Sequence, residues 1–291
     1  MPEIRTALVV ERDLPQHQAV LTLIRDRLDD PDVTSFDWLD LGCGSGKILQ
    51  SAGRALPEHF RAKITYLGID LWRAPSLEAE RLAKSLFRSA QIITSELVAS
   101  DALLSGDATF DAVTMTNTVH EVSPRSLATL LTSTIIRIAD QGFFFIYDME
   151  RLPDLELGAV PWRPAEIERI IRCLAQCCGC TEPLPTVSTW QHRTCNGWQI
   201  QIKRSSLPLT RAEMTTRRSE IEAAVTLAIA DVLQLKLNET HAALDALSRY
   251  GSSTEEERQE ARRLAYDFWA IARSLDVPLR IGETYDGVIT I

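Results

Sequence analysis

The chain has 291 residues, of which 45% are hydrophobic and 24% are charged. These values are ordinary for a folded globular protein and exclude global disorder. Its 31 basic residues are outnumbered by 40 acidic ones, and a net charge of -9 argues against a dedicated nucleic-acid binder. No apolar run approaches the roughly 20 residues of a membrane-spanning helix, and the first residues do not resemble a secretion signal. We therefore expect a cytoplasmic protein.

The first 35 residues are expected to form a helical segment. Apolar side chains recur at helical spacing over 15–30, which predicts one amphipathic helix. This segment is a candidate lid over the binding site considered below. Its one histidine, His17, is expected at the surface.

Short apolar runs alternate with helical patterns from Phe36 onward. The runs lie at 38–41, 64–70, 92–93, 110–115 and 143–147, and the helical stretches lie at 46–55, 76–89, 124–139 and 164–178. Runs that are apolar on both faces and separated by helices are typical of a doubly wound, mostly parallel sheet with helices on both sides. The sequence therefore predicts an α/β fold.

Two β-rich runs close this domain, at 187–193 and 197–203. The Asn196-Gly197 pair between them is a hairpin signal, so the seven-stranded sheet should end in an antiparallel pair and the domain should span 36–204. The remaining residues, 205–291, carry two amphipathic helical patterns, the second of which begins at a capping box starting with Thr254. This helical extension either packs on the sheet domain or serves dimerisation or partner binding, and the sequence leaves both open.

The strongest chemical signal is a glycine-rich turn between the first strand and the following helix. Asp40 precedes Gly42, Gly44 and Gly46 there. Glycines let the backbone turn sharply and approach a ligand, while the helix start offers free N–H groups. The Gly-x-Gly-x-Gly spacing fits neither the dinucleotide fingerprint nor the P-loop, which disfavours a nicotinamide oxidoreductase.

This turn resembles the first motif of class I S-adenosylmethionine-dependent methyltransferases. Asp70, at the end of the second strand, is similar to the family's acid that accepts the two ribose hydroxyls. Ser100-Asp101-Ala102 resembles the loop that faces adenine, and 110–113 resembles the start of the fourth strand. Asp140-Gln141-Gly142 replaces the usual Pro-Gly-Gly before the fifth strand. The resemblance spans about 36–204 and implies a Rossmann-like domain that binds S-adenosyl-L-methionine through Asp40, Gly42, Gly44, Gly46, Asp70, Leu71, Asp101, Ala102 and Asn117.

Methyl transfer from a sulfonium requires alignment first and a base only where the acceptor must lose a proton. His120, just beyond the fourth strand, is the first candidate base, with a helix-capping or substrate-orienting role weighed equally. Glu121 is expected to bind substrate, to hold His120 or to face solvent. Asp148 and Trp162 are candidates to border the substrate pocket, and the alternatives are a polar loop at Asp148 and packing of Trp162 against the helix start. The paired carboxylate-Asn motif of catechol-type enzymes is missing, so no catalytic metal is predicted.

Four cysteines gather at 173–180, near His192 and Cys195. Thiolates and an imidazole can build a zinc site, but only one Cys-x-x-Cys pair, Cys177 and Cys180, is present. We therefore expect these side chains to pack as small apolar residues.

The leading functional hypothesis is methyl transfer to a small molecule. The alternatives are a non-catalytic cofactor-binding subunit that binds a partner through its C-terminal helices, or a protein or RNA methyltransferase. The acceptor atom, whether oxygen, nitrogen, carbon or sulfur, is not indicated by the sequence.

Overall fold

The computed structural model describes residues 14–97, 107–152, 154–181, 187–191, 196–250 and 254–276. They form a seven-stranded sheet in the order β3-β2-β1-β4-β5-β7-β6. The strands are β1 (Phe36–Leu41), β2 (Ile64–Asp70), β3 (Ser89–Thr94), β4 (Phe110–Thr116), β5 (Ile138–Met149), β6 (Ser188–Gln191) and β7 (Asn196–Lys203). Strands β1 to β5 pair in parallel, whereas β7 is antiparallel to β5 and to β6. The predicted α/β fold with a terminal antiparallel hairpin is confirmed.

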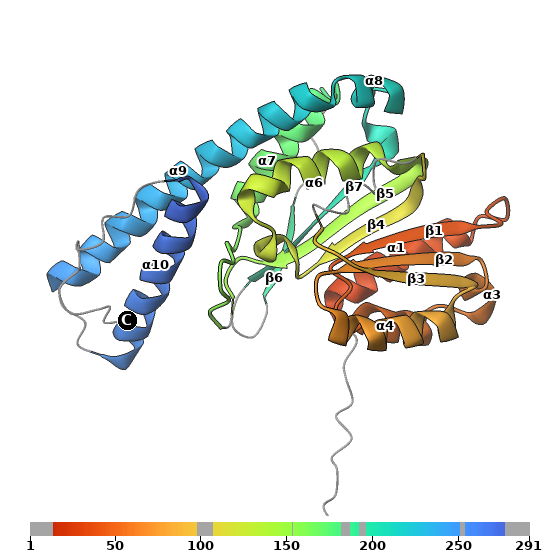
Figure 1. Cartoon of the computed structure of the whole chain (residues 1–291), viewed down its shortest axis with the longest axis horizontal. Helices are drawn as coiled ribbons and strands as arrows, with labels where there is room; N and C mark the ends of the chain where they lie inside the picture. The colour runs from red at the N-terminus through yellow and green to blue at the C-terminus, as the bar shows by residue number, and fades with distance from the viewer. Residues whose placement is uncertain are drawn as a thin grey trace, which may run out of the picture.

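Both faces of the sheet are covered by helices, as Figure 1 shows. Strand β5 shows that both faces are buried, because successive side chains of a strand point to opposite faces of the sheet. Phe143, Phe145 and Tyr147 enter one buried cluster, whereas Phe144 and Ile146 enter the other. The first cluster includes helices α1 (Pro15–Leu28), α2 (Lys47–Ala55) and α4 (Arg73–Leu86), and the second includes α6 (Pro124–Ile136) and α7 (Pro164–Cys177).

The structure corrects several predicted boundaries. The helix expected over 124–139 ends at Ile136, and β5 already begins at Ile138, because a register shift opposite Gly142 lets the strand start early. A Cβ on Gly142 would lie 2.8 Å from two backbone carbonyl oxygens of the neighbouring strand, so the strands approach too closely there for any side chain. Two short helices, α3 (Glu58–Arg61) and α8 (Arg211–Thr216), were not predicted.

The C-terminal extension forms two long helices, α9 (Arg218–Tyr250) and α10 (Glu255–Ser274). Helix α9 crosses α6 and α7 and extends past the sheet, and α10 folds back along it (Figure 1). The predicted capping box is present, with Thr254 and Glu257 bonded reciprocally at the start of α10. None of the described helices is both long and apolar enough to cross a membrane.

Helix α9 shares the core of the sheet domain. Its buried side chains belong to the same apolar cluster as β4, β5, α6 and α7, and they are Ile221, Val225, Ile229, Val232, Leu233 and Leu237. Of the two roles left open by the sequence, packing on the sheet domain is therefore present in the structure. A role in dimerisation or partner binding stays a prediction.

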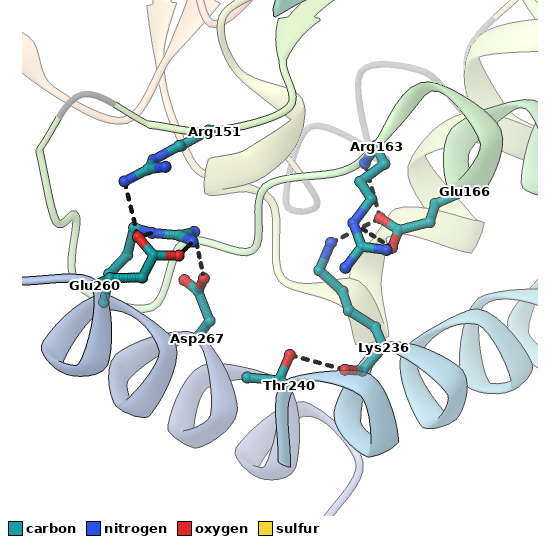
Figure 2. A network of polar contacts seen from close by, with 8 residues as sticks. Arg151, Arg163, Glu166, Lys236, Thr240, Glu260 and Asp267 are labelled. Atoms are coloured by element: carbon teal, nitrogen blue, oxygen red, sulfur yellow. Dashed lines mark hydrogen bonds and ion pairs between the residues drawn. The ribbon is translucent and has the colours of Figure 1, made fainter. Parts of the chain in front are cut away.

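Ion pairs fix the tail helices to the segment that follows β5, as Figure 2 shows. Lys236 of α9, only 6% exposed, places its Nζ 2.7 Å from a carboxylate oxygen of Glu166 at the start of α7. Arg151 pairs with Glu260 of α10 at 3.0 Å. Because one of these pairs is shielded from water, the network resists screening better than separate surface pairs would.

The cysteine cluster lies at the end of α7. Cys178 and Cys180 are buried in the apolar cluster. Burial raises the pKa of the Cys178 thiol to about 12 and that of Cys173 to about 11, so both are neutral at physiological pH. Their packing fits the apolar role expected from the sequence; His192 and Cys195 lie outside the described residues.

Because α9 and the sheet share one core, we expect the chain to unfold in one cooperative step. Ile229→Ala removes buried methyl groups and should lower the free energy of unfolding by about 2–5 kcal/mol. Leu227→Ala, on the same helix but at a side chain that is 68% exposed, should change it by less than about 0.5 kcal/mol. Urea titrations followed by circular dichroism and tryptophan fluorescence measure both. A separate transition for the tail would contradict the shared core.

Candidate functional site

The glycine turn runs from the end of β1 into α2. Gly42, Gly44 and Gly46 all have positive φ angles, of 74°, 51° and 81°. A Cβ on Gly42 would lie 2.2 Å from Oγ1 of Thr118, so a glycine is needed where the turn passes that side chain. A Cβ on Gly44 would meet nothing within 4 Å among the described residues. The turn therefore has one side packed against the protein and one side facing open space.

Asp40 lies beneath this turn and is 1% exposed. Its carboxylate accepts hydrogen bonds from the hydroxyls of Tyr66 at 2.8 Å and Thr114 at 2.6 Å. Burial raises the pKa of Asp40 to about 6, although these two hydrogen bonds act in the opposite direction. The Asp40 carboxyl therefore gains or loses its proton at a pH that occurs in cells.

Asp70 ends β2 at the same edge of the sheet. One carboxylate oxygen accepts the Gly44 N–H at 2.7 Å and the other accepts the Trp72 N–H at 2.8 Å. Each oxygen keeps a second lone pair, so the carboxylate can still accept hydroxyl donors. Leu71 follows it and is half exposed. Asp101 and Ala102, predicted to face adenine, lie outside the described residues.

Asn117 follows β4 and is held in an unusual conformation. Its φ is 53°, and its N–H donates to the carbonyl of Tyr147 at 2.9 Å. Its side-chain Oδ1 is buried and has no hydrogen-bond partner among the described residues. An unpaired buried acceptor costs about 1–3 kcal/mol, so this atom fits a site that receives a donor from a ligand.

Two cavities meet around the glycine turn. The first, of about 320 Å³, is lined by the turn, Asp40, Lys47 and Asn117, with His17 from α1 and Leu14 just before it. The second, of about 280 Å³, is lined by Asp70, Leu71, Glu96 and Leu97 among others. They share Gly42, Asp70, Trp72, Thr118 and Glu121. The two together form a continuous site at the carboxyl edge of β1, β2 and β4, where open α/β sheets bind ligands.

Helix α1 forms part of the wall of the first cavity. His17 was expected at the surface, but it is buried and its Nδ1 lies 2.9 Å from Oγ of Ser51 in α2. The correction follows from the packing of α1 on α2, which a single amphipathic pattern does not specify. Whether α1 moves as a lid stays a prediction.

His120 lies in the short helix η1 (Val119–Glu121) after β4 and is held by carboxylates on both ring nitrogens. Nδ1 lies 2.7 Å from Asp148, whose carboxylate also accepts the His120 backbone N–H at 3.0 Å. Nε2 lies 3.1 Å from a carboxylate oxygen of Glu156. Because a carboxylate only accepts, Nδ1 carries the hydrogen of its bond to Asp148.

Burial alone would lower the pKa of His120, but the hydrogen bond to Asp148 and the charges of Asp148, Glu156 and Glu121 raise it to about 9. The imidazole is therefore charged at neutral pH, and Nε2 has no lone pair to receive a proton. The base role of His120 stays a prediction that requires Nε2 to lose this proton first.

Asp148 and Trp162 lie differently from the expectation that they border the substrate pocket. Asp148 is fully buried beneath His120, and Trp162 is fully buried in the apolar cluster, where its carbonyl accepts the Trp198 indole N–H at 2.8 Å. Neither lines the cavities described here. The chain after β5 turns inward, and the local sequence does not show whether an aromatic beside a helix start faces a pocket or the core.

Glu121 stands at the junction of the site. It lines both cavities above and a third of about 500 Å³, which is bounded by Arg125, Leu157, Gly158 and residues of α10 including Arg273. Burial raises the pKa of Glu121, while His120 acts to lower it. One side chain therefore connects the space around the glycine turn with the space beneath the tail helices.

Helix α10 positions the turn at 156–158. The hydroxyl of Tyr266 accepts the Gly158 N–H at 2.6 Å and donates to the carbonyl of Glu156. Neither Glu156 nor Tyr266 was singled out in the sequence. No local motif marks them, because they reach the site only through the long-range packing of the tail.

We expect the Asp40 carboxyl to titrate near pH 6 instead of the usual 4. Its folded-state pKa is raised, so its contribution to stability is complete below about pH 4 and is lost as the pH rises through 6. Carbon-13 NMR of labelled aspartate carboxyls measures the midpoint, and Asp40→Asn assigns the resonance. A midpoint near 4 would show that burial does not control this group.

Residues 39–144 match a family model described as a methyltransferase domain. The chain is similar to the structure of magnesium protoporphyrin IX methyltransferase (ChlM) from Synechocystis PCC 6803 with bound SAH, at 13% identity and a TM-score of 0.44, over 64% of this chain and 81% of that one. It is also similar to 1,6-didemethyltoxoflavin-N1-methyltransferase from Burkholderia thailandensis, at 15% identity and a TM-score of 0.47, over 66% and 79% of the two chains. No curated protein sequence matches it.

These two structures are too distant from the chain to indicate its substrate or its mechanism. The family model, in contrast, covers the segment that carries the glycine turn, Asp70 and His120. Residues 39–144 therefore match a methyltransferase domain, in agreement with the class I motifs that the sequence indicated.

Proposed function

We propose that the protein transfers a methyl group from S-adenosyl-L-methionine to a small molecule. The observation that carries this proposal is the convergence, at one sheet edge, of an open glycine turn, the Asp70 carboxylate and the unpaired buried Oδ1 of Asn117. A ligand with a charged amino group at one end and a ribose at the other supplies the donors that both side chains accept.

The two smaller cavities accommodate the two ends of such a cofactor. The cavity with Asp70, Leu71 and Leu97 would hold the adenosine end, with the carboxylate on the ribose hydroxyls and apolar side chains beside the base. Asp101 and Ala102 would complete this side. The cavity with Asn117 and Asp40 would hold the methionine end, whose ammonium group would donate to Oδ1. When bound, the cofactor supplies a methyl group on a sulfonium.

The third cavity is the proposed site of the acceptor. Its volume of about 500 Å³ lies within the range of small-molecule sites, roughly 300–1,000 Å³. Glu121 faces both this space and the cofactor cavities, so it is placed to orient the acceptor toward the methyl group. His120, whose ring is fixed by Asp148, lies beside Glu121 with its Nε2 3.9 Å from that carboxylate. Alignment of this kind contributes roughly 7–11 kcal/mol to such reactions.

Cofactor binding is the first test. Purified protein should bind S-adenosylmethionine and S-adenosylhomocysteine with micromolar affinity in titration calorimetry, and NAD should not bind. Asp70→Ala should weaken binding by at least about tenfold, since it removes charge-assisted hydrogen bonds worth about 1.5–3 kcal/mol. Asp140→Ala, an exposed acid at the opposite end of β5, is the matched control. Failure of both sulfur ligands to bind would refute the proposal.

Turnover tests the acceptor side. With a small-molecule extract as acceptor source and labelled cofactor, Glu121→Gln should lower the rate of methyl transfer by about 100-fold, because misplacement near 1 Å has that effect. Cofactor affinity should fall much less than the rate, because Asp70 and Asn117, the proposed partners of the ribose and the amino group, are unchanged. Glu80→Gln, which alters an ordinary surface pair with Lys84, should leave the rate unchanged. Cofactor binding without transfer to any acceptor would favour a non-catalytic role.

A further inference from the structure

Three ligand-type side chains converge at the junction of the three cavities, where Glu121 lines all of them. They are His120, Glu121 and Glu156, and one imidazole nitrogen and two carboxylate oxygens lie within 4.8 Å of one another. Nε2 of His120 is 3.1 Å from Glu156 and 3.9 Å from Glu121. Cations bound by such atoms at about 2.0–2.2 Å hold neighbouring ligand atoms about 3.0–3.5 Å apart, so small side-chain shifts complete the set.

The imidazole is oriented as a ligand would be, independently of the two glutamates. Its Nδ1–H donates to Asp148, which is fully buried, and this bond directs Nε2 outward to the glutamates. Metal-binding histidines almost always donate their other ring N–H to a carboxylate or carbonyl in this way. The backbone of His120 is also fixed, since its N–H donates to Asp148 and its carbonyl accepts the Val160 N–H at 2.8 Å.

Negatively charged groups outnumber positively charged ones around His120, so a bound cation would reduce the excess negative charge. Three carboxylates, from Glu121, Asp148 and Glu156, face one imidazole. In the part of the chain that the structure describes, no lysine or arginine forms an ion pair with either glutamate. Arg125, at the rim of the neighbouring cavity, is instead paired with Asp276 and with carbonyls at the end of α10.

We propose that His120, Glu121 and Glu156 bind one divalent first-row transition-metal cation. A set of one imidazole and two carboxylates suits Mn²⁺ or Zn²⁺ better than Mg²⁺ or Ca²⁺, which prefer oxygen alone. The cation takes the place of the Nε2 proton, which passes to solvent. Three protein ligands leave coordination positions open, and Glu121 lines the 500 Å³ cavity as well. The binding of the cation does not depend on the proposed function. Its role, which is to hold an oxygen or nitrogen of the acceptor, does rest on that function.

Titration of Mn²⁺ into chelator-treated, untagged full-length protein tests the site, with free Mn²⁺ measured by electron paramagnetic resonance. One equivalent should bind, and Zn²⁺ should displace it. Glu121→Gln and Glu156→Gln should each weaken binding by at least about tenfold. Pulsed resonance of bound Mn²⁺ should show coupling to one imidazole nitrogen.

Two control variants should leave Mn²⁺ affinity unchanged. Glu80→Gln alters an acid of a surface pair, and His241→Ala alters a histidine that lies 3.8 Å from Asp245 on α9. Affinity no tighter than about millimolar, unchanged binding in either glutamine variant, or the absence of nitrogen coupling would overturn the proposal. Calorimetry with S-adenosylmethionine on the same samples separates the two questions, because Glu156→Gln should lose Mn²⁺ while keeping the cofactor.

Discussion

The buried carboxylate of Asp148 is the constraint on which the acceptor side of the site depends. Asp148 lies near the end of β5. Because β5 runs parallel to β4, the end of β5 lies beside the turn after β4 that carries His120. One carboxylate binds both the backbone and the ring of that histidine, so the orientation of the imidazole is fixed by strand pairing and not by a flexible loop. A buried charge of this kind is strongly destabilising without its partner, which makes the pair an obligatory part of the fold. Glu121, the next residue, is thereby held at the junction of the three cavities.

The C-terminal helices complete this side of the molecule. Arg125, at the start of α6, donates to the carbonyls of Arg273 and Ser274, so the end of α10 closes over the third cavity. Tyr266 fixes the turn that carries Glu156. The glycine turn and Asp70, in contrast, come from residues 36–70 alone. The glycine turn with Asp70 is thus built locally, whereas the acceptor side needs segments that are more than 100 residues apart in the chain.

That division explains what the sequence could predict. The strand over 64–70, the terminal antiparallel pair of strands and the acids at the ends of β1 and β2 follow from local patterns, and parallel strands bring their ends to one edge. The position of the turn was predicted wrongly, because Asn196 and Gly197 belong to β7 and pair with Gln191 and Trp190 of β6. The position of His120 at this edge was predictable in the same way. Its charge was not, because the pKa depends on carboxylates from two other segments. Asp148 and Trp162 illustrate the same limit, since a polar or aromatic residue near a strand end can face a pocket or a buried neighbour, and only the path of the chain decides.

The positive charge on His120 also has a consequence for methyl transfer. Asp40, Asp70 and Glu121 gather negative charge around the place proposed for a sulfonium, and such charge stabilises the cofactor before reaction. The positive charge on sulfur disappears as the methyl group leaves, so stabilisation of the ground state alone would slow the reaction. A cationic group on the acceptor side reduces this effect where the charge is being dispersed and leaves the acids near the ribose and amino groups free to bind. The imidazolium held between Asp148 and Glu156 offsets only part of the negative charge that these acids and Glu121 bring to this place, and a divalent cation bound there would offset more of it.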